Sequence, residues 1–436
     1  MHVSRLALDD FRSWNHCVID LVPGLNVLVG HNGVGKTNIV ESIEVLATGS
    51  SHRVTSSIPL VRRGARTATI RANIGEHTYE MTIPARGANR ARIDSGKSLY
   101  YREIAGRVRC VTFSPLDQTL VSGDPAGRRA FLNAVTAQKI PGYYAAAQEL
   151  TRTGRQRAAL LKILGHQEAE RRANPAPNPP TGPSWLEGGA LPDPTLAGLE
   201  TWTARFVTLG IAVTRARGRA IAALADTFSD IYRALAGEGN GEAGLAYAPS
   251  LQEVIDCDVQ AAAASPGEAG AGGDDAEIRR RIGEHFQRIY PGETARGANL
   301  IGPHRDDLAI TLDGVPAKEF ASNGETWTLA LALRMAQFRA LAGDDAPLSG
   351  EDERPILVLD DVFAQLDDSR RRQIVDFARQ AGQVLVTVAS PGDIPDGIDA
   401  NIIDVERLAA AGDDVFATLG LTKDDVAALA APKGGD

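Results

Sequence analysis

The sequence of 436 residues predicts an α/β fold, in which a mixed sheet with flanking helices is divided along the chain by an inserted helical arm. Short apolar runs rich in β-branched residues lie near both ends, at 25–29, 355–359 and 383–389, and helical patterns follow or separate them. Between them, 141–173 and 196–236 are rich in Ala, Arg and Leu at helical spacing, which predicts long helices.

These changes in composition predict four parts of the chain. We expect one half of the head at 1–122, the inserted helical arm at 123–296, the second half of the head at 297–421 and a tail at 422–436. Two stretches within the arm predict mobile loops, near 174–195 and 264–275. The first is rich in Pro and the second in Gly and Ala, and neither composition holds a regular element.

Composition also predicts a compartment. The three cysteines are far apart in sequence and form no CxxC pair, which is typical of free thiols in a reducing environment. No apolar run approaches the length of a membrane span, and the first residues lack the apolar core of a signal peptide. We therefore expect a cytoplasmic protein without a membrane partner.

The formal net charge of −9 conceals two basic segments. Residues 51–110 carry twelve Lys or Arg against four Asp or Glu, and residues 125–173 carry nine against three. Phosphate contacts need clustered Lys and Arg and no base-specific motif, so these segments agree with nucleic-acid binding that is governed by structure rather than by sequence. A solvated surface charge is the alternative for each residue. The candidate contacts are Arg62, Arg63, Arg66, Arg128, Arg129, Arg152 and Arg155.

The strongest chemical motif lies between the apolar run 25–29 and a predicted helix that begins at Lys36. It matches the P-loop pattern GxxxxGK[ST], which predicts that ATP and Mg²⁺ bind here. Glycines let backbone N–H groups curl around phosphates, the Lys36 amine reaches the β- and γ-phosphates, and the Thr37 hydroxyl is a magnesium ligand. On the helix itself, Glu41 and Glu44 are expected to face away from the core. The candidate nucleotide-binding residues are Gly30, His31, Asn32, Gly33, Val34, Gly35, Lys36 and Thr37.

A P-loop needs a carboxylate at the end of another buried strand to hold magnesium. The run PILVLDD supplies two. Asp360 is the predicted magnesium ligand, and Asp361 is the predicted general base that polarises the attacking water. Lys36, Asp360 and Asp361 are thus the candidate catalytic residues. The alternative is that adjacent aspartates mark only the end of a strand.

A third motif precedes another predicted helix. Ser322 and Glu325 fit the capping-box pattern S-x-x-E, which is a purely structural alternative. Capping does not require Gly324, however, and a missing side chain there permits close approach of a ligand. In ABC-type ATPases, such a Ser-x-Gly-[Glu/Gln] signature binds the γ-phosphate held by the opposite subunit. Ser322, Gly324 and Glu325 are therefore candidate nucleotide-binding residues.

The order of P-loop, helical insert, signature and paired aspartates resembles the RecF family. FRSW at 11–14, VTFSPLDQTLVSGDPAGRRAFLN at 111–133 and GPHRDD at 302–307 resemble the family as well. For GPHRDD, a turn held by an Arg305 to carboxylate contact is one reading and a functional site the other. Gln365 stands where the family's D-loop has Glu, and Ser390 stands where a switch histidine is expected. Both departures predict slow hydrolysis.

The RecF resemblance implies an ABC-type ATPase head, an ATP-dependent homodimer and binding to single-stranded or gapped DNA. It also implies a weak, DNA-stimulated ATPase that acts as a switch in recombinational repair and replication restart. The implied partners are RecO and RecR, with help in loading RecA and support of the SOS response. The alternatives are a transporter's nucleotide-binding subunit, a DNA-bridging SMC-like tether and a scaffold that does not hydrolyse ATP. The basic helical insert disfavours the first, and the short insert without heptads disfavours the second.

Overall fold

The computed structural model describes residues 1–54, 56–173, 194–237, 239–264, 273–343, 354–363, 368–390, 392 and 400–412. The tail 422–436 and most of both predicted loops lie outside these ranges. Contacts divide the chain into two compact units. The head unit comprises Met1–Gly123, Thr227–Ala243 and Leu312–Asp436, and the arm unit comprises Asp124–Asp226 and Gly244–Thr311.

This division differs from the domain boundaries expected from sequence in two places. Residues 227–243 group with the head, where the amide of Gln373 donates to the carbonyl of Leu235 at 3.3 Å. Residues 297–311 group with the arm, because their two aspartates pair with arginines of the arm helices. The first boundary, between Gly123 and Asp124, lies one residue from the expected one.

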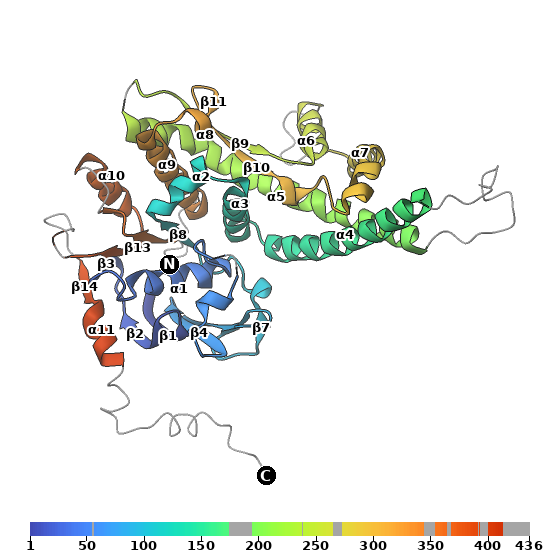
Figure 1. Ribbon diagram of the computed structural model, residues 1–436. Helices are drawn as coiled ribbons and strands as arrows, with labels where there is room; N and C mark the ends of the chain where they lie inside the picture. Colours follow the sequence, from blue (N-terminus) through green and yellow to red (C-terminus); the bar gives the residue numbers. More distant parts are fainter. Residues whose placement is uncertain are drawn as a thin grey trace, which may run out of the picture. The chain divides into compact units, whose positions relative to one another are not determined.

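The head contains a five-stranded parallel sheet that joins both ends of the chain (Figure 1). Its strands, in spatial order, are β14 (Asn401–Asp404), β3 (Gly24–Val29), β13 (Gln383–Val388), β12 (Ile356–Asp360) and β8 (Cys110–Phe113). All residues of β8, β12 and β13 are buried, which explains their largely apolar sequences. The three apolar runs that predicted strands coincide with β3, β12 and β13.

A six-stranded antiparallel sheet completes the head, so the expected mixed sheet is realised as two sheets. Its order is β2 (Trp14–Asp20), β1 (Val3–Phe11), β4 (Thr67–Ile74), β5 (His77–Pro84), β6 (Arg90–Ile93) and β7 (Leu99–Tyr100). Buried and more exposed residues alternate along β4 and β5, as in a strand with one covered face. Part of the first basic segment, 51–110, forms strands β4 to β7 of this sheet.

The head helices are α1 (Lys36–Thr48), α2 (Gln118–Ser122), α8 (Ala317–Phe320), α9 (Asn323–Ala342), α10 (Asp368–Ala378) and α11 (Val405–Gly412). Helix α1 contacts strands of both sheets, among them β8, β13 and β1. Helix α9 is buried on nearly all sides and packs against β8 and α2. The N-termini of α1 and α9 carry the P-loop and signature sequences.

The arm is mainly helical, as the sequence predicts. Its helices are α3 (Pro125–Lys139), α4 (Tyr143–Ala173), α5 (Pro194–Ala236), α6 (Gln252–Ala264) and α7 (Asp275–Arg296), and the last turns of α5 group with the head. Strands β9 (Ala243–Ala248), β10 (Asp307–Leu312) and β11 (Val315–Pro316) form a third sheet in the order β11, β10, β9, of which β11 groups with the head. Buried Phe206, Ile211 and Phe286 belong to the arm's core.

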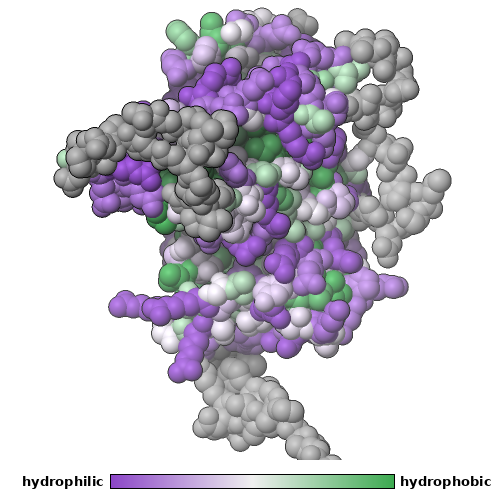
Figure 2. Space-filling model, turned by 90° about the vertical axis from the view of Figure 1, so that its right-hand side faces the viewer, coloured by the Kyte–Doolittle hydropathy of each residue, from purple (hydrophilic) through white to green (hydrophobic). Residues whose placement is uncertain are grey.

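One face of the molecule is largely polar. On the face drawn in Figure 2, hydrophilic residues predominate and hydrophobic ones form small separate patches. Across the described ranges, no helix combines the length and apolar character needed to cross a membrane.

Candidate nucleotide-binding site

The loop Gly30–Thr37 connects the end of β3 to the start of α1, as the sequence predicts. The Lys36 amine donates to the carbonyl of Gly30 at 2.5 Å and to that of His31 at 3.0 Å. Lys36 is buried, so its positive charge is held inside the loop. This arrangement keeps the amine beside the space that a P-loop offers to phosphates.

The conformation of the loop depends on Gly35 and Trp14. Gly35 has φ +109°, and a Cβ built there would lie 2.8 Å from the indole nitrogen of Trp14. The same indole donates to the carbonyl of Gly35 at 3.1 Å. Any side chain at position 35 would therefore displace Trp14 and strain the backbone. FRSW thus helps to hold the P-loop, a role that sequence reasoning did not assign to it.

Thr37 and Asp360 meet across 323 residues of sequence. The Thr37 hydroxyl donates to Asp360 Oδ1 at 2.9 Å, and the Thr387 hydroxyl donates to the same oxygen at 2.7 Å. Asp360 ends β12 and is buried, while Thr387 lies on the neighbouring strand β13. The parallel strands β3 and β12, which flank β13, thus bring the two predicted magnesium ligands into contact at one edge of the sheet. Thr387 is a third member that sequence reasoning missed.

These residues fit a magnesium ion by the chemistry of their donor atoms. Mg²⁺ prefers oxygen ligands, keeps several waters and is commonly bound through one or two protein groups plus substrate phosphates. A hydroxyl and a carboxylate in contact at the end of a P-loop supply two such groups. In the described part of the chain, no cluster of three or more His, Cys, Asp or Glu forms an all-protein metal site.

Asp361, the predicted general base, follows β12 and is exposed. Its backbone has φ +53°, a left-handed conformation that is uncommon outside glycine but tolerated best by Asp and Asn. Its N–H donates to Thr387 Oγ1 at 2.9 Å, which fixes the turn. Thr387 therefore orients both aspartates. Its hydroxyl donates a hydrogen bond to the Asp360 carboxylate and accepts one from the N–H of Asp361.

A carboxylate occupies the approach to the P-loop. Glu406, in the first turn of α11, accepts from the backbone N–H of His31 at 2.9 Å and lies 2.8 Å from its ring nitrogen Nδ1. These hydrogen bonds lower the pKa of Glu406. The negatively charged carboxylate of Glu406 thus contacts a loop whose backbone N–H groups are suited to binding anions. No spacing in the sequence linked Glu406 to the P-loop.

The expectation that Glu41 faces away from the core is wrong. Glu41 is buried, where it accepts hydrogen bonds from the guanidinium of Arg12, from Arg53 and from the Ser51 hydroxyl. Arg12 Nε lies 2.8 Å from Glu41 Oε2. A buried carboxylate requires such partners, and the FRSW turn supplies one of them.

The candidate signature residues form a helix cap in this chain. Ser322 Oγ accepts from the N–H of Glu325 at 3.3 Å, and the Glu325 carboxylate accepts from the N–H of Ser322 at 2.8 Å. The capping box is therefore present, and it is compatible with a second role. Ser322 and Asn323 are exposed, and Phe320 just before them is 70% exposed.

The three basic candidates of the head differ in their surroundings. Arg62 Nε donates to Asp10 Oδ1 at 2.7 Å, so its charge is partly compensated. Arg63 and Arg66 are exposed, and their side chains have no hydrogen-bond or ion-pair partner within the described ranges. These two are therefore the more available cations of the segment.

The four basic candidates of the arm also separate into two kinds. Arg128 is buried and forms a two-pronged pair with Asp307, at 2.7 and 2.9 Å. Arg152 pairs with Glu149 on the same helix. Arg129 and Arg155 line a cavity of the arm instead. Arg128 therefore stabilises the arm and is not an open surface cation.

The GPHRDD stretch is a structural turn, but Arg305 does not hold it through a carboxylate. Arg305 Nε donates to the carbonyl of Asn299 at 3.1 Å. The two aspartates of the stretch hold the turn instead. Asp307 pairs with Arg128, and buried Asp306 accepts a hydrogen bond from Arg217 at 2.6 Å. Asp306 accepts from the N–H of Ser250 as well.

Comparisons with known proteins decide the family. The model of the RecF/RecN/SMC N-terminal domain matches residues 2–397. A protein of Bifidobacterium longum subsp. infantis named DNA replication and repair protein RecF is 50% identical over 429 residues, covering 97% of this chain and 94% of its own. The RecF protein of Bifidobacterium adolescentis is 50% identical over 435 residues, covering 99% and 96%.

This chain belongs to the RecF family. A solved structure of the recombination mediator protein RecF, described as RecF-ATP in the RecFOR pathway, superposes with a TM-score of 0.71 over 90% of this chain and 93% of that one. At 22% identity this likeness shows a shared RecF fold. The expected fold class, an α/β ATPase-type head divided by a helical arm, is thereby confirmed.

Two RecF-family departures that predicted slow hydrolysis have different outcomes. The D-loop sequence Gln365–Asp367 lies outside the described residues. Ser390 is described, and it lies exposed just after β13, where a switch histidine was expected. The prediction of slow hydrolysis therefore rests on the sequence.

Proposed function

We propose that this RecF-family protein is an ATP-dependent DNA-binding protein of recombinational repair and replication restart. The contact between Thr37 and Asp360 carries the proposal, because it joins the two predicted magnesium ligands at the end of a P-loop. The relatives' names, DNA replication and repair protein RecF, support the biological role. Binding to single-stranded or gapped DNA is the proposed activity.

ATP is the proposed nucleotide, and Mg²⁺ the proposed metal. Lys36 would neutralise the β- and γ-phosphates, and the backbone of Gly33 to Thr37 would surround them. Thr37 and Asp360 would hold the metal, which supplies positive charge against the phosphate oxygens. Asp361 would accept a proton from the attacking water. We propose a weak, DNA-stimulated ATPase whose hydrolysis resets a switch.

We further propose that ATP joins two copies of this chain. The exposed N-terminus of α9 offers the Ser322 hydroxyl, the Gly324 N–H and a helix-dipole end to a γ-phosphate held by the other copy. Exposed Phe320 gives the same edge an apolar contact that a second copy would cover. Loss of the γ-phosphate would then separate the copies.

DNA contacts are proposed for Arg63 and Arg66 on the head, because both guanidiniums are exposed and lack carboxylate partners in the described chain. Such groups bind phosphates without reading sequence. From the family resemblance we also propose a cytoplasmic location, RecO and RecR as partners, assistance in loading RecA and support of the SOS response. The solved relative is described as a recombination mediator of the RecFOR pathway, which supports RecO and RecR as partners.

Binding of gapped, single-stranded and duplex DNA, each measured with ATP, with ADP and without nucleotide, tests the function. The proposal expects the tightest binding with ATP on gapped or single-stranded DNA, and loss of the ATP effect in Lys36→Met. Lys97→Met, which removes an exposed lysine of the head, is the matched control. Equal affinities in all three nucleotide states would contradict an ATP-dependent DNA binder.

A further inference from the structure

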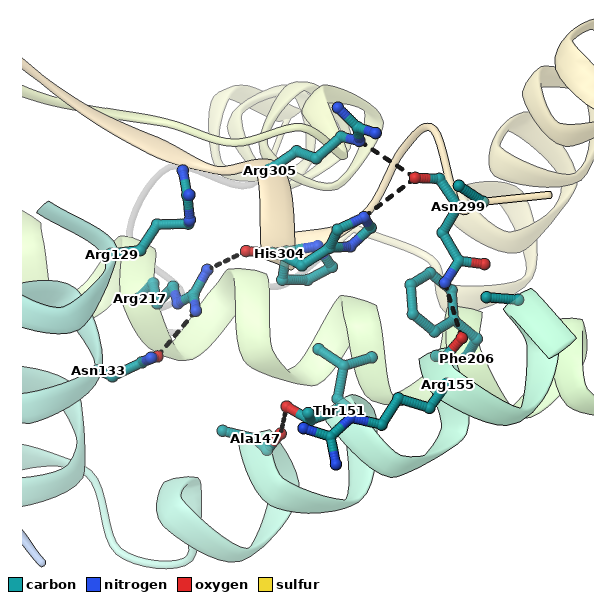
Figure 3. Close-up of a pocket in the computed structure, with 15 residues that line it drawn as sticks. Arg129, Asn133, Ala147, Thr151, Arg155, Phe206, Arg217, Asn299, His304 and Arg305 are labelled. Atoms are coloured by element: carbon teal, nitrogen blue, oxygen red, sulfur yellow. Dashed lines mark hydrogen bonds between the residues drawn. The ribbon is translucent and has the colours of Figure 1, made fainter. Parts of the chain in front are cut away.

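A cavity of about 540 Å³ lies within the arm, between helices α3, α4 and α5 and the GPHRDD turn (Figure 3). Four arginines line it: Arg129 from α3, Arg155 from α4, Arg217 from α5 and Arg305 from the turn. No Asp or Glu is among the described residues of its lining. Its volume is in the range of small-ligand sites.

Three of these arginines are not neutralised by a carboxylate. Arg129 donates to the backbone carbonyl of Asp306 at 3.3 Å, and Arg305 donates to the backbone carbonyl of Asn299 at 3.1 Å. Arg155 has no hydrogen-bond or ion-pair partner in the described part of the chain. Carbonyls position a guanidinium but leave its full charge, so the cavity carries uncompensated positive charge from three sides.

The nearby carboxylates are already engaged elsewhere. Asp306 is fully buried and accepts from Arg217 and from the N–H of Ser250, and Asp307 is paired with Arg128. Arg217 is buried and also donates a hydrogen bond to Asn133, so its guanidinium stabilises the turn and is less available to a ligand in the cavity. The positive charge that no carboxylate neutralises in the cavity therefore comes from Arg129, Arg155 and Arg305.

The other residues that line the cavity limit the kinds of ligand that it can bind. Ala147, Ala158 and Pro303 contribute small apolar surfaces, while Phe206 is only 2% exposed and offers no ring face for stacking a base. His304 packs edge-on to Phe206, and its pKa is lowered by desolvation and by neighbouring arginines. Guanidinium groups without a stacking surface favour an anion over a base.

We propose that this cavity binds a phosphate group of a DNA strand, independently of base sequence. The inference deepens the proposed DNA binding and rests on it. Planar guanidiniums arriving from α3, α4 and the GPHRDD turn match the several oxygens of one phosphate. The phosphate belongs either to the interior of a strand or to its 5′ end, and the chemistry of recognition is the same.

The test uses the full chain and the double variant Arg155→Gln/Arg305→Gln. Its control is Arg280→Gln/Arg281→Gln, which removes two charges from arm arginines that pair with Glu277 and do not line the cavity. The probes are a 3′-labelled single strand with a 5′ phosphate, and the same strand with a 5′ hydroxyl. Fluorescence anisotropy with ATP across a salt series measures affinity.

The cavity variant should bind about tenfold or more weakly, because it loses charge-assisted hydrogen bonds, and its salt slope should fall by about 1.4 for two lost single-strand contacts. Equal loss on both probes assigns an interior phosphate, and loss confined to the phosphorylated probe assigns a terminal one. If the double variant unfolds at a lower temperature than the wild type, the single variant Arg155→Gln repeats the test. This substitution breaks no hydrogen bond or ion pair within the described chain.

A loss no greater than in the control would overturn the phosphate site while leaving the proposed function intact. Failure of the wild-type chain to bind either probe or gapped DNA would overturn the proposed function, and the phosphate site with it.

Discussion

Thr37 Oγ1 lies 2.9 Å from Asp360 Oδ1, although 323 residues separate them in sequence. The two residues follow β3 and end β12, with β13 between these strands. Thr387 on β13 holds the same oxygen of Asp360 at 2.7 Å and the N–H of Asp361 at 2.9 Å. The paired aspartates are therefore held in place by the middle strand.

Lys36→Met should weaken ATP binding at least tenfold, about 1.4 kcal/mol, because no other side chain of the loop brings a positive charge to the phosphates. Titration calorimetry with a non-hydrolysable ATP analogue measures it. Lys97→Met should bind like the wild type. A Lys36→Met protein that retains full affinity would refute the P-loop assignment.

Glu406→Gln should raise ATP affinity a few-fold. The substitution keeps a hydrogen-bond acceptor for the N–H of His31 but removes a negative charge that repels the incoming phosphates. The same titration measures the change, and it should shrink with added salt. Glu76→Gln, another exposed glutamate of the head, is the control. Unchanged affinity would show that Glu406 has no influence on the bound phosphates.

Ser322→Asp should stay monomeric with ATP while keeping its melting temperature. Aspartate caps helices as well as serine does, but its charge repels the γ-phosphate of a facing copy. Phe320→Ser should also weaken dimerisation, since it removes the apolar side chain at that edge. Light scattering with ATP and with ADP measures both. Dimers of folded Ser322→Asp as tight as the wild type's would remove the signature role.

Arg63→Gln/Arg66→Gln should weaken binding to unrelated duplex sequences alike. If each arginine neutralises one phosphate, the slope of log affinity against log salt falls by about 1.8. Arg5→Gln/Arg92→Gln removes the same charge from arginines that pair with Asp20 and Glu80, and should change little. An unchanged slope for the first variant would exclude this pair from the DNA surface.

Asp307→Asn should cost about 1–2 kcal/mol of unfolding free energy at pH 7, because Arg128 loses its charged partner. Burial alone would raise the pKa of Asp307, but hydrogen bonds from Arg128 and the N–H of Leu308 outweigh it, and the pKa is lowered. The wild type's advantage is therefore complete above about pH 4 and is lost as pH falls through the lowered pKa. Urea unfolding between pH 7 and pH 2 measures the difference. A difference that is independent of pH would contradict the ion pair.

The sequence predicted strands β3, β12 and β13 of the parallel sheet, and it placed the P-loop pattern between a strand and a helix, as found between β3 and α1, because both depend on local patterns. Runs such as 355–359 are apolar throughout since both faces of β12 are covered. The strands of the antiparallel sheet were not predicted, although buried and more exposed residues alternate along β4 and β5. Polar and charged residues take the more exposed positions, as Arg71 does in β4 where it pairs with Glu80, so no continuous apolar run marks these strands.

Contacts between distant segments could not be predicted from local patterns. Glu41 looked like a solvent-facing position on α1, and only the folded chain brings Arg12 and Arg53 to it. Arg128 looked like a surface cation for the same reason, since its partner Asp307 lies 179 residues away. Glu406 and Thr387 carry no motif, so their places beside the P-loop emerged only from the structure.

The position of β3 has a consequence for synthesis of the chain on the ribosome. Both neighbours of β3, β13 and β14, come from residues 383–404, so the strand that leads into the P-loop has no partner until they emerge. At about 5–20 residues per second, β3 waits roughly 20–75 s for them. The antiparallel sheet, made wholly from residues 3–100, is free to fold first. A nascent or prematurely ended chain can thus be partly folded without a complete ATP site, and an exposed apolar strand makes it a target for chaperones during that interval.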